Sequence, residues 1–326
     1  MTSAHTNESA RSLALLRTMM RIRRFEEIAE IAQRDGEIPG TLHLSIGQEG
    51  VAAGVCSALE RTDLITSTHR GHGHSIAKGA SLAAMMAELF GRATGCCRGK
   101  GGSMHVADFS VGMLGANGVV GGGIGIAVGA AQGLRVRGSS AVVASFFGDG
   151  AVNRGPFLES LNWAATFKLP VLFICEDNGF AAFTQTSRLT AGEGPAARAT
   201  ALGISSTVVD GNDVVAVADV ATASVERMRC GEGPMFLHAR TYRLRGHTIA
   251  DKGAYRDAAE HARREALDPI LLLRQQLVAG GAATAVEAVA AEVEAELAAA
   301  LAAARVGPFP DAAEALTDVQ TAGAPS

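Results

Sequence analysis

Short apolar runs alternate with helix-like segments between residues 141 and 242, and this alternation constrains the fold more than any other feature of the sequence. The apolar runs have the length of buried strands, and the proline near the start of the first helix-like segment is tolerated in a first helical turn. Strands separated by helices predict an α/β fold with a central, mostly parallel sheet and helices on both of its faces. The predicted strands are residues 141–147, 171–175, 207–209 and 235–242, and the helices between them are residues 156–167 and 213–229.

Helical patterns also lie near both ends of the chain. Apolar residues from Leu15 to Ala32 recur at three- and four-residue spacing, which predicts a helix with one buried stripe. Residues 284–305 consist mostly of alanine, glutamate, valine and leucine and predict one long helix. We therefore expect an N-terminal helical segment over residues 1–40, an α/β domain over residues 41–265 and a C-terminal helical extension over residues 266–326.

The region before the first predicted strand is rich in glycine and histidine. Residues 41–60 and 81–93 predict helices on either side of a loop at residues 69–74. Residues 95–123 are glycine-dense and show no regular period, and a stretch of this length within a compact domain is usually functional or disordered. The basic residues Arg21, Arg23 and Arg24 next to acidic ones predict the solvated face of a helix.

Composition excludes several classes of protein. The chain is 48% hydrophobic and 19% charged, an apolar surplus that favours a large core or a large subunit interface. Its net charge of −4 disfavours a nucleic-acid partner, which needs a clustered positive surplus. Five irregularly spaced cysteines, no apolar leader and no run as long as a membrane span predict a cytoplasmic protein without membrane contact.

Three polar segments directly follow predicted strands. They are residues 148–150 (GDG), 176–180 (EDNGF) and 243–247 (RLRGH). In an open parallel sheet, ligands bind beyond the carboxyl ends of the strands. We therefore expect Asp149 and Asn178 at one edge of the sheet, although they are 29 positions apart.

The oxygen atoms at this edge suit a hard cation. Asp149 offers a carboxylate, Asn178 offers an amide oxygen, and the backbone carbonyl near Phe180 offers a third ligand. Mg²⁺ prefers oxygen ligands in near-octahedral geometry, and two oxygens of a diphosphate together with a water would complete its shell. The segment predicts a site for Mg²⁺ and a diphosphate.

The residues around Asp149 have both a functional and a structural interpretation. Gly148 and Gly150 let the backbone approach phosphates, and Ala151 and Val152 lead into a helix whose N-terminal amides favour an anion. A lone GDG is more often an ordinary turn. Its pairing with a second strand that ends in DNG favours the site.

These segments, together with several others, resemble a known protein family. The GDG-to-Asn178 segment is similar to the thiamin-diphosphate fingerprint, and further blocks resemble alpha subunits of the dehydrogenase (first) component of 2-oxo acid dehydrogenase complexes, of the acetoin dehydrogenase or pyruvate dehydrogenase type. The resemblance extends from about residue 13 to about residue 319. The blocks are residues 43–49 (HLSIGQE), 66–74 (TSTHRGHGH), 99–105 (GKGGSMH), 115–121 (GANGVVG), 242–247 (YRLRGH) and 308–319 (PFPDAAEALTDV).

The resemblance implies a thiamin-diphosphate-binding fold and a set of site residues. It implies Mg²⁺ bound by Asp149, Asn178 and the carbonyl of Phe180. It implies catalytic or pocket-lining roles for His247, His43 and Arg243. The residues implied to contact thiamin diphosphate are His69, Arg70, Gly118, Val120, Gly148, Asp149, Gly150, Ala151, Asn178 and His247.

The resemblance also implies a reaction and partners. Enzymes of this type cleave the C–C bond next to a carbonyl of acetoin or of a 2-oxo acid such as pyruvate and transfer the acyl group to a lipoyl carrier. A glutamate of a beta subunit supports the aminopyrimidine ring, so we expect a heterotetramer of two alpha and two beta subunits that works with a lipoyl acyltransferase component. Arg154 and Phe183 depart from the family's pattern. They leave open a thiamin-diphosphate-dependent lyase, ligase or diketone-cleaving enzyme that needs no lipoyl complex.

Two other motifs have competing interpretations. Residues 121–129 (GGGIGIAVG) resemble a dinucleotide-binding loop, but no convincing strand precedes them, and a helix of small residues at a subunit interface fits better. His69, His72 and His74 suggest a zinc site, but their spacing and the lack of a nearby cysteine pair disfavour it.

Overall fold

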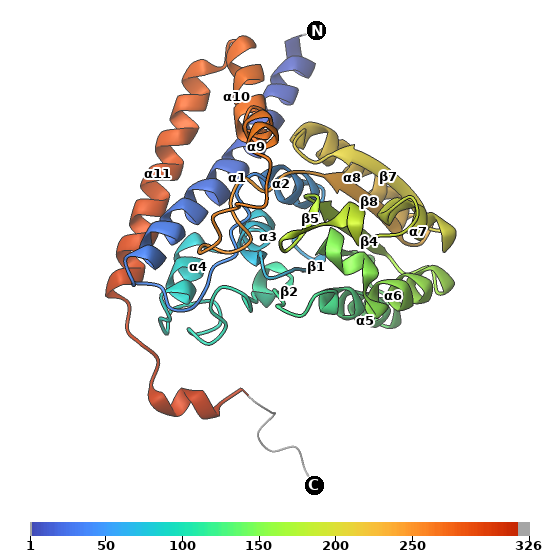
Figure 1. Cartoon of the computed structure of the whole chain (residues 1–326), viewed down its shortest axis with the longest axis horizontal. Helices are drawn as coiled ribbons and strands as arrows, with labels where there is room; N and C mark the ends of the chain where they lie inside the picture. Colours follow the sequence, from blue (N-terminus) through green and yellow to red (C-terminus); the bar gives the residue numbers. More distant parts are fainter. Residues whose placement is uncertain (1, 319–326) are drawn as a thin grey trace.

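A six-stranded sheet forms the centre of the protein, and every strand pairing in it is parallel. The computed structural model describes the backbone of residues 2–318 and the side chains from residue 8 onward (Figure 1). The strand order is β2-β1-β3-β4-β8-β7. The strands are β1 (Leu64–Thr66), β2 (Met113–Gly115), β3 (Val143–Gly148), β4 (Val171–Asp177), β7 (Ser205–Asp210) and β8 (Met235–Arg240).

Helices cover both faces of this sheet because its central strands are apolar on both sides. Along β4, Leu172 and Ile174 belong to one core cluster, whereas Val171 and Phe173 belong to another. The first cluster takes side chains from α2 (Glu49–Ser57), α3 (Gly71–Lys78), α4 (Leu82–Leu89) and α8 (Val214–Arg229). The second takes them from α5 (Gly122–Val136), α6 (Gly155–Thr166) and α7 (Pro195–Ala201). The α/β fold with two covered faces is confirmed.

The two ends of the chain pack against each other. Helix α1 (Thr2–Arg34) lies alongside α11 (Ala283–Val306), and α10 (Pro269–Ala279) joins them after the short α9 (Ala258–Glu265) (Figure 1). The predicted stripe from Leu15 to Ala32 is buried. Ion pairs such as Arg21–Glu296 (2.8 Å) and Arg24–Glu294 (2.7 Å) lie at the exposed rim, where each contributes at most about 1 kcal/mol. The buried stripe therefore holds these helices together.

The structure corrects several predicted boundaries in the first third of the chain. Residues 41–48 are not helical, and helix α2 begins only at Glu49. The predicted loop at residues 69–74 is wrong as well, because α3 begins at Gly71. Its glycines serve close packing: a Cβ on Gly71 would lie 2.6 Å from the Cβ of Ala116. Packing here overrides the weak helix propensity of the sequence.

Other differences are smaller. The short strands β1 and β2 fall outside the predicted set, while residues 121–129 do form the start of a helix, α5. The last residue of the block 308–319 lies outside the described residues. Within residues 2–318, no helix is both long enough and apolar enough to cross a membrane.

The basic cluster of α1 is only partly solvated. Arg23 donates to Glu49 at 2.5 Å and to Asp268 at 2.8 Å, and Glu49 is fully buried. Glu26 is also fully buried and accepts hydrogen bonds from Ser45. The prediction of a solvated face was therefore wrong for Arg23 and Glu26. These two residues bind helix α1 to Glu49 of α2 and to the loop before it.

Candidate active site

A cavity of about 370 Å³ opens at the carboxyl edge of the sheet. It is lined by residues that lie within three positions after the ends of five of the six strands, β1, β2, β3, β4 and β8. All thirteen residues predicted for the site line this one cavity: His43, His69, Arg70, Gly118, Val120, Gly148, Asp149, Gly150, Ala151, Asn178, Phe180, Arg243 and His247. The fold therefore brings together segments from residue 43 to residue 247.

Asp149 has an unsatisfied carboxylate oxygen inside the cavity. The residue is 4% exposed, and its Oδ1 accepts a hydrogen bond from the Gly150 amide at 2.9 Å. Its Oδ2 is buried and has no partner among the described residues. Burial, together with the nearby charge of Asp177, raises the pKa of Asp149 to about 7. An orphaned, buried carboxylate oxygen fits a missing cation.

Asn178 lies in the same wall with its amide group fixed. Its Nδ2 donates to Gln48 Oε1 at 2.9 Å, and its Oδ1 accepts from the Phe180 amide at 3.2 Å. The remaining lone pair of Oδ1 is available to a cation. Gln48 was not predicted as a site residue, although it belongs to the block at residues 43–49. The donor set of one carboxylate and one amide oxygen suits Mg²⁺.

Close backbone packing explains the glycine after Asp149. A Cβ on Gly150 would lie 3.0 Å from the Cβ of Ala181, which belongs to the two-stranded hairpin of β5 (Phe180–Ala181) and β6 (Thr184–Gln185). Ala151 leads into the predicted helix at residues 156–167, which the structure confirms to within one residue at each end. Residues Asp149–Asn153 form the short 3₁₀ helix η2, and the α-helix begins only at Gly155.

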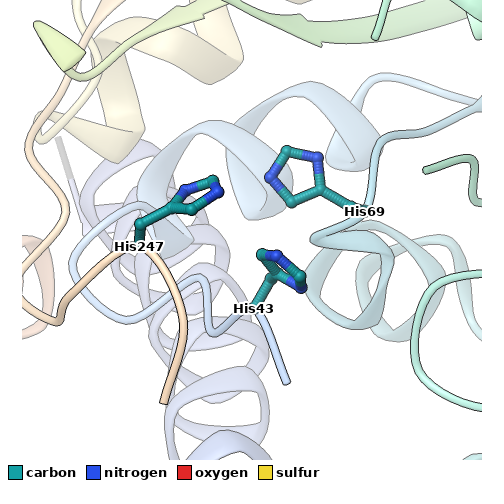
Figure 2. Close-up of side chains that lie close together, drawn as sticks. All are labelled: His43, His69 and His247. Atoms are coloured by element: carbon teal, nitrogen blue, oxygen red, sulfur yellow. The ribbon is translucent and has the colours of Figure 1, made fainter. Parts of the chain in front are cut away.

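Three histidines from distant segments converge on one side of the cavity. Figure 2 shows the rings of His43, His69 and His247 around one space, with ring centroids 4.7–5.7 Å apart. Burial, and then the positive charge of Arg70, lower the pKa of His43 and His247 to about 4 and that of His69 to about 2. All three imidazoles are therefore neutral at pH 7.

Two buried arginines make this side of the cavity positive. Arg70 is 6% exposed and donates to the backbone carbonyls of Leu44 (2.6 Å) and His247 (2.9 Å). Arg243 is 1% exposed and donates to the Tyr255 hydroxyl at 2.8 Å. Burial lowers the pKa of Arg70 to about 9 and also lowers that of Arg243. Neither forms a salt bridge with a carboxylate within residues 8–318.

Buried cations without a salt bridge favour an anionic ligand over a metal ion at the histidines. A buried charge without a counter-charge is costly, and a bound anion removes that cost. A cation at the three histidines would instead be repelled by Arg70 and Arg243. Arg70 Nη2 also lies 3.2 Å from His247 Nδ1. Since arginine only donates, His247 Nδ1 accepts and its proton resides on Nε2.

The other two histidines of the HRGHGH segment have different partners. His72 contacts Glu26 at 2.9 Å and Ser103 at 3.0 Å, away from the cavity. The three histidines considered for zinc, His69, His72 and His74, therefore do not converge on one ion.

His74 connects two cavity-lining residues that the sequence prediction missed. Its Nδ1 lies 2.7 Å from Ser67 Oγ, and its Nε2 lies 3.2 Å from Glu176 Oε1. Ser67 directly follows β1, and Glu176 lies near the end of β4. The strand-end rule that identified Asp149 and Asn178 therefore also applies to them.

Known proteins match almost the whole chain. The family model described as dehydrogenase E1 component matches residues 17–313. The alpha subunit of acetoin:2,6-dichlorophenolindophenol oxidoreductase from Bacillus subtilis is 42% identical over 310 residues, which cover 95% of this chain and 93% of that protein. The corresponding subunit from Cupriavidus necator is 46% identical over 248 residues, 76% of this chain and 74% of that protein.

A pyruvate dehydrogenase subunit is similar to the same extent. The E1 component subunit alpha of pyruvate dehydrogenase from Rhizobium meliloti is 41% identical over 310 residues, 94% of this chain and 89% of that protein. These matches confirm the resemblance drawn from the motifs. The family implies dependence on thiamin diphosphate, and an alpha subunit implies a beta subunit. The chain belongs to the dehydrogenase E1 component family, as an alpha subunit of a thiamin-diphosphate-dependent dehydrogenase.

Proposed function

We propose that this chain is the half of an active site that binds Mg²⁺ and the diphosphate of thiamin diphosphate, in an enzyme that cleaves acetoin or a 2-oxo acid such as pyruvate. The observation that carries the proposal is the charge pattern of the cavity. One side of this pattern is the orphaned carboxylate oxygen of Asp149, and the other is the buried Arg70 and Arg243, which form no salt bridges to carboxylates among the described residues. A cation bound to a diphosphate satisfies both sides at once.

In this proposal Asp149, Asn178 and the Phe180 carbonyl hold Mg²⁺. Arg70 balances the charge of the diphosphate, His69 contacts it as a neutral imidazole, and the backbone at Gly118 and Val120 supports the rings. When bound, thiamin diphosphate would supply the nucleophilic carbon and the electron sink that cleavage of a C–C bond next to a carbonyl needs. The residues of this chain bind and orient that group.

We assign His247 the role of a hydrogen-bond donor to the substrate oxygen. It is neutral at pH 7, and its Nε2 carries the proton because Arg70 contacts Nδ1. A donor of this kind stabilises negative charge that develops on oxygen. A diphosphate bound nearby raises the pKa of the imidazole and brings it closer to proton transfer at neutral pH. His43 and Arg243 line the same pocket.

The proposed partner is a beta subunit that completes the site, in an assembly of two alpha and two beta subunits. Two observations support it. Val119 and Val120, in the loop expected to support the rings, are exposed at the cavity, and Phe109 nearby in sequence is 76% exposed. Exposed apolar residues in a site loop are typical of a surface that another protein covers. We propose a lipoyl acyltransferase component as the acyl acceptor.

Co-expression with the beta subunit tests the proposal. The assembled protein is titrated with thiamin diphosphate with and without Mg²⁺, and its turnover is measured by dye reduction with acetoin, pyruvate and a branched 2-oxo acid. We expect Mg²⁺-dependent binding and turnover of acetoin or pyruvate. Absence of thiamin diphosphate binding contradicts the proposal. Turnover that releases an aldehyde without any electron acceptor instead supports a lyase that needs no lipoyl complex.

A further inference from the structure

The hairpin of β5 and β6 contributes Ala181 and Ala182 to the lining of the cavity, and its tip consists of Ala182 and Phe183. The hairpin is anchored from below. Arg243 donates to the Ala182 carbonyl at 3.3 Å, and the Thr186 amide donates to the Gly179 carbonyl at 3.0 Å. Ala182 adopts a positive φ of 53°, which is uncommon for a residue with a side chain. The tip is therefore held in one specific turn, and that turn fixes where Phe183 lies.

Phe183 places its phenyl ring beside the imidazole of His247. The two ring centroids are 5.5 Å apart at 77°, and Phe183 makes a second edge-to-face contact with Tyr255 at 5.5 Å and 75°. Despite these contacts the residue is 56% exposed. Its neighbours Ala181 and Ala182 line the cavity, as does His247. Phe183 itself does not line the cavity, so its ring stands just outside the rim, against His247, with its remaining surface exposed.

We propose that Phe183 forms the apolar wall against the acyl substituent of the substrate and restricts that substituent to a small, uncharged group such as methyl or ethyl. This inference rests on the proposed function, in which the Nε2 proton of His247 contacts the substrate oxygen. The group attached to the same carbonyl carbon must then lie within a few ångströms of the imidazole.

The surroundings of His247 decide which wall that group meets. Three aromatic rings contact its imidazole in the described part of the chain, and two of them are the histidines of the positive side. Phe183 supplies the one apolar ring among these three. A charged substituent would lose hydration against a phenyl ring without gaining a partner, so a second carboxylate is disfavoured there. A branched chain needs the space that the ring occupies.

Substitution of Phe183 tests the inference in the assembled enzyme. The values of kcat/KM for pyruvate, 2-oxobutanoate and 3-methyl-2-oxobutanoate are compared by dye reduction for the wild type, Phe183→Ala and Phe183→Leu. We expect the ratio of branched to methyl substrate to rise by about 10-fold or more in Phe183→Ala, since pocket shape of this kind typically discriminates by 10- to 200-fold. Phe183→Leu keeps an apolar wall and should shift the ratio less.

Phe309→Ala is the matched control. It also removes an exposed phenyl ring, one that packs on Arg92 outside the cavity, and it should leave the ratio unchanged. A binding readout that needs no turnover accompanies the kinetics: the affinity of the cofactor-loaded protein for acetylphosphonate and for its branched analogue. In Phe183→Ala the branched analogue should gain affinity relative to the methyl one.

The outcomes separate the inference from the function on which it rests. Suppose that the wild type binds thiamin diphosphate and turns over pyruvate or acetoin. If Phe183→Ala then leaves the ratios of branched to methyl substrate and of branched to methyl inhibitor unchanged, the inference alone is overturned. A wild type that prefers the branched substrate overturns it as well. A wild type that neither binds thiamin diphosphate nor turns over any of these carbonyl compounds overturns the proposed function first.

Discussion

Replacing Asp149 by asparagine should stabilise the cofactor-free protein while abolishing its response to the cofactor. Burial and the charge of Asp177 raise the pKa of Asp149 from 3.8 to about 7. At about 1.4 kcal/mol for each tenfold change in proton affinity, the ionised carboxylate costs the folded state about 4 kcal/mol. Asparagine removes the charge and can still accept the hydrogen bond that the Gly150 amide donates. We expect the free energy of unfolding at pH 8 to rise by about 1–4 kcal/mol.

The pH dependence fixes the sign of this effect. Because the folded pKa of Asp149 is raised, its contribution to stability is complete below pH 3.8 and is lost as the pH rises through 7. The difference in the free energy of unfolding between Asp149→Asn and the wild type should therefore grow by about 2–3 kcal/mol between pH 5 and pH 8. Denaturant unfolding of the assembled, metal-free protein at both pH values measures it. Asp213→Asn, an exposed helix N-cap that keeps a capping side chain, should show no such growth.

The cofactor should offset most of this difference in stability. At a concentration 100-fold above its dissociation constant, a ligand stabilises the folded state by about 2.7 kcal/mol. Thiamin diphosphate with Mg²⁺ should give this gain to the wild type and not to Asp149→Asn. The reasoning is refuted if Asp149→Asn is less stable than the wild type at pH 8 without cofactor, or if both proteins gain equally from the cofactor.

Three further predictions follow from the same cavity. Gly150→Ala should weaken thiamin diphosphate binding about 10-fold, because the added Cβ presses on Ala181 at 3.0 Å and costs roughly 1–3 kcal/mol; fluorescence titration measures this, and unchanged affinity contradicts it. The depressed pKa values of His43, His69 and His247 mean that the cofactor-free protein should lose stability as the pH falls from 6.5 towards 4, and His247→Asn should make this loss less steep in thermal unfolding scans. His247→Ala should retain cofactor affinity and lose at least about 100-fold in acyl transfer to a lipoyl acceptor; normal transfer would exclude the assigned role.

The sequence predicted the sheet and its ligand-binding edge well. The strands at residues 141–147, 171–175, 207–209 and 235–242 all exist, with ends displaced by one or two residues. Buried parallel strands leave a continuous apolar signal that neighbouring segments do not obscure. Asp149 and Asn178 were found for the same reason, because each directly follows such a strand and the topology brings strand ends together.

Features that depend on distant packing were harder to predict. Helix α3 contains glycine and histidine and forms because it is packed against the chain around Ala116, which no local pattern reveals. Glu26 looked like part of a solvated face but is buried by Ser45 and His72 from other segments. The convergence of His43, His69 and His247 likewise requires three segments to meet in space. Resemblance identified these three residues individually, and the neutral cluster that they form is visible only in the fold.

The central claim, that the cation and the diphosphate lie between Asp149 and Arg70, is tested most directly by anomalous diffraction. The assembled enzyme is crystallised with thiamin diphosphate and with Mn²⁺ in place of Mg²⁺, and the metal is located by its anomalous signal. We expect one peak within metal–ligand distance of Asp149 Oδ2 and Asn178 Oδ1, with the diphosphate extending towards Arg70. A peak among His43, His69 and His247, or a cofactor bound without contact to Asp149, would contradict it.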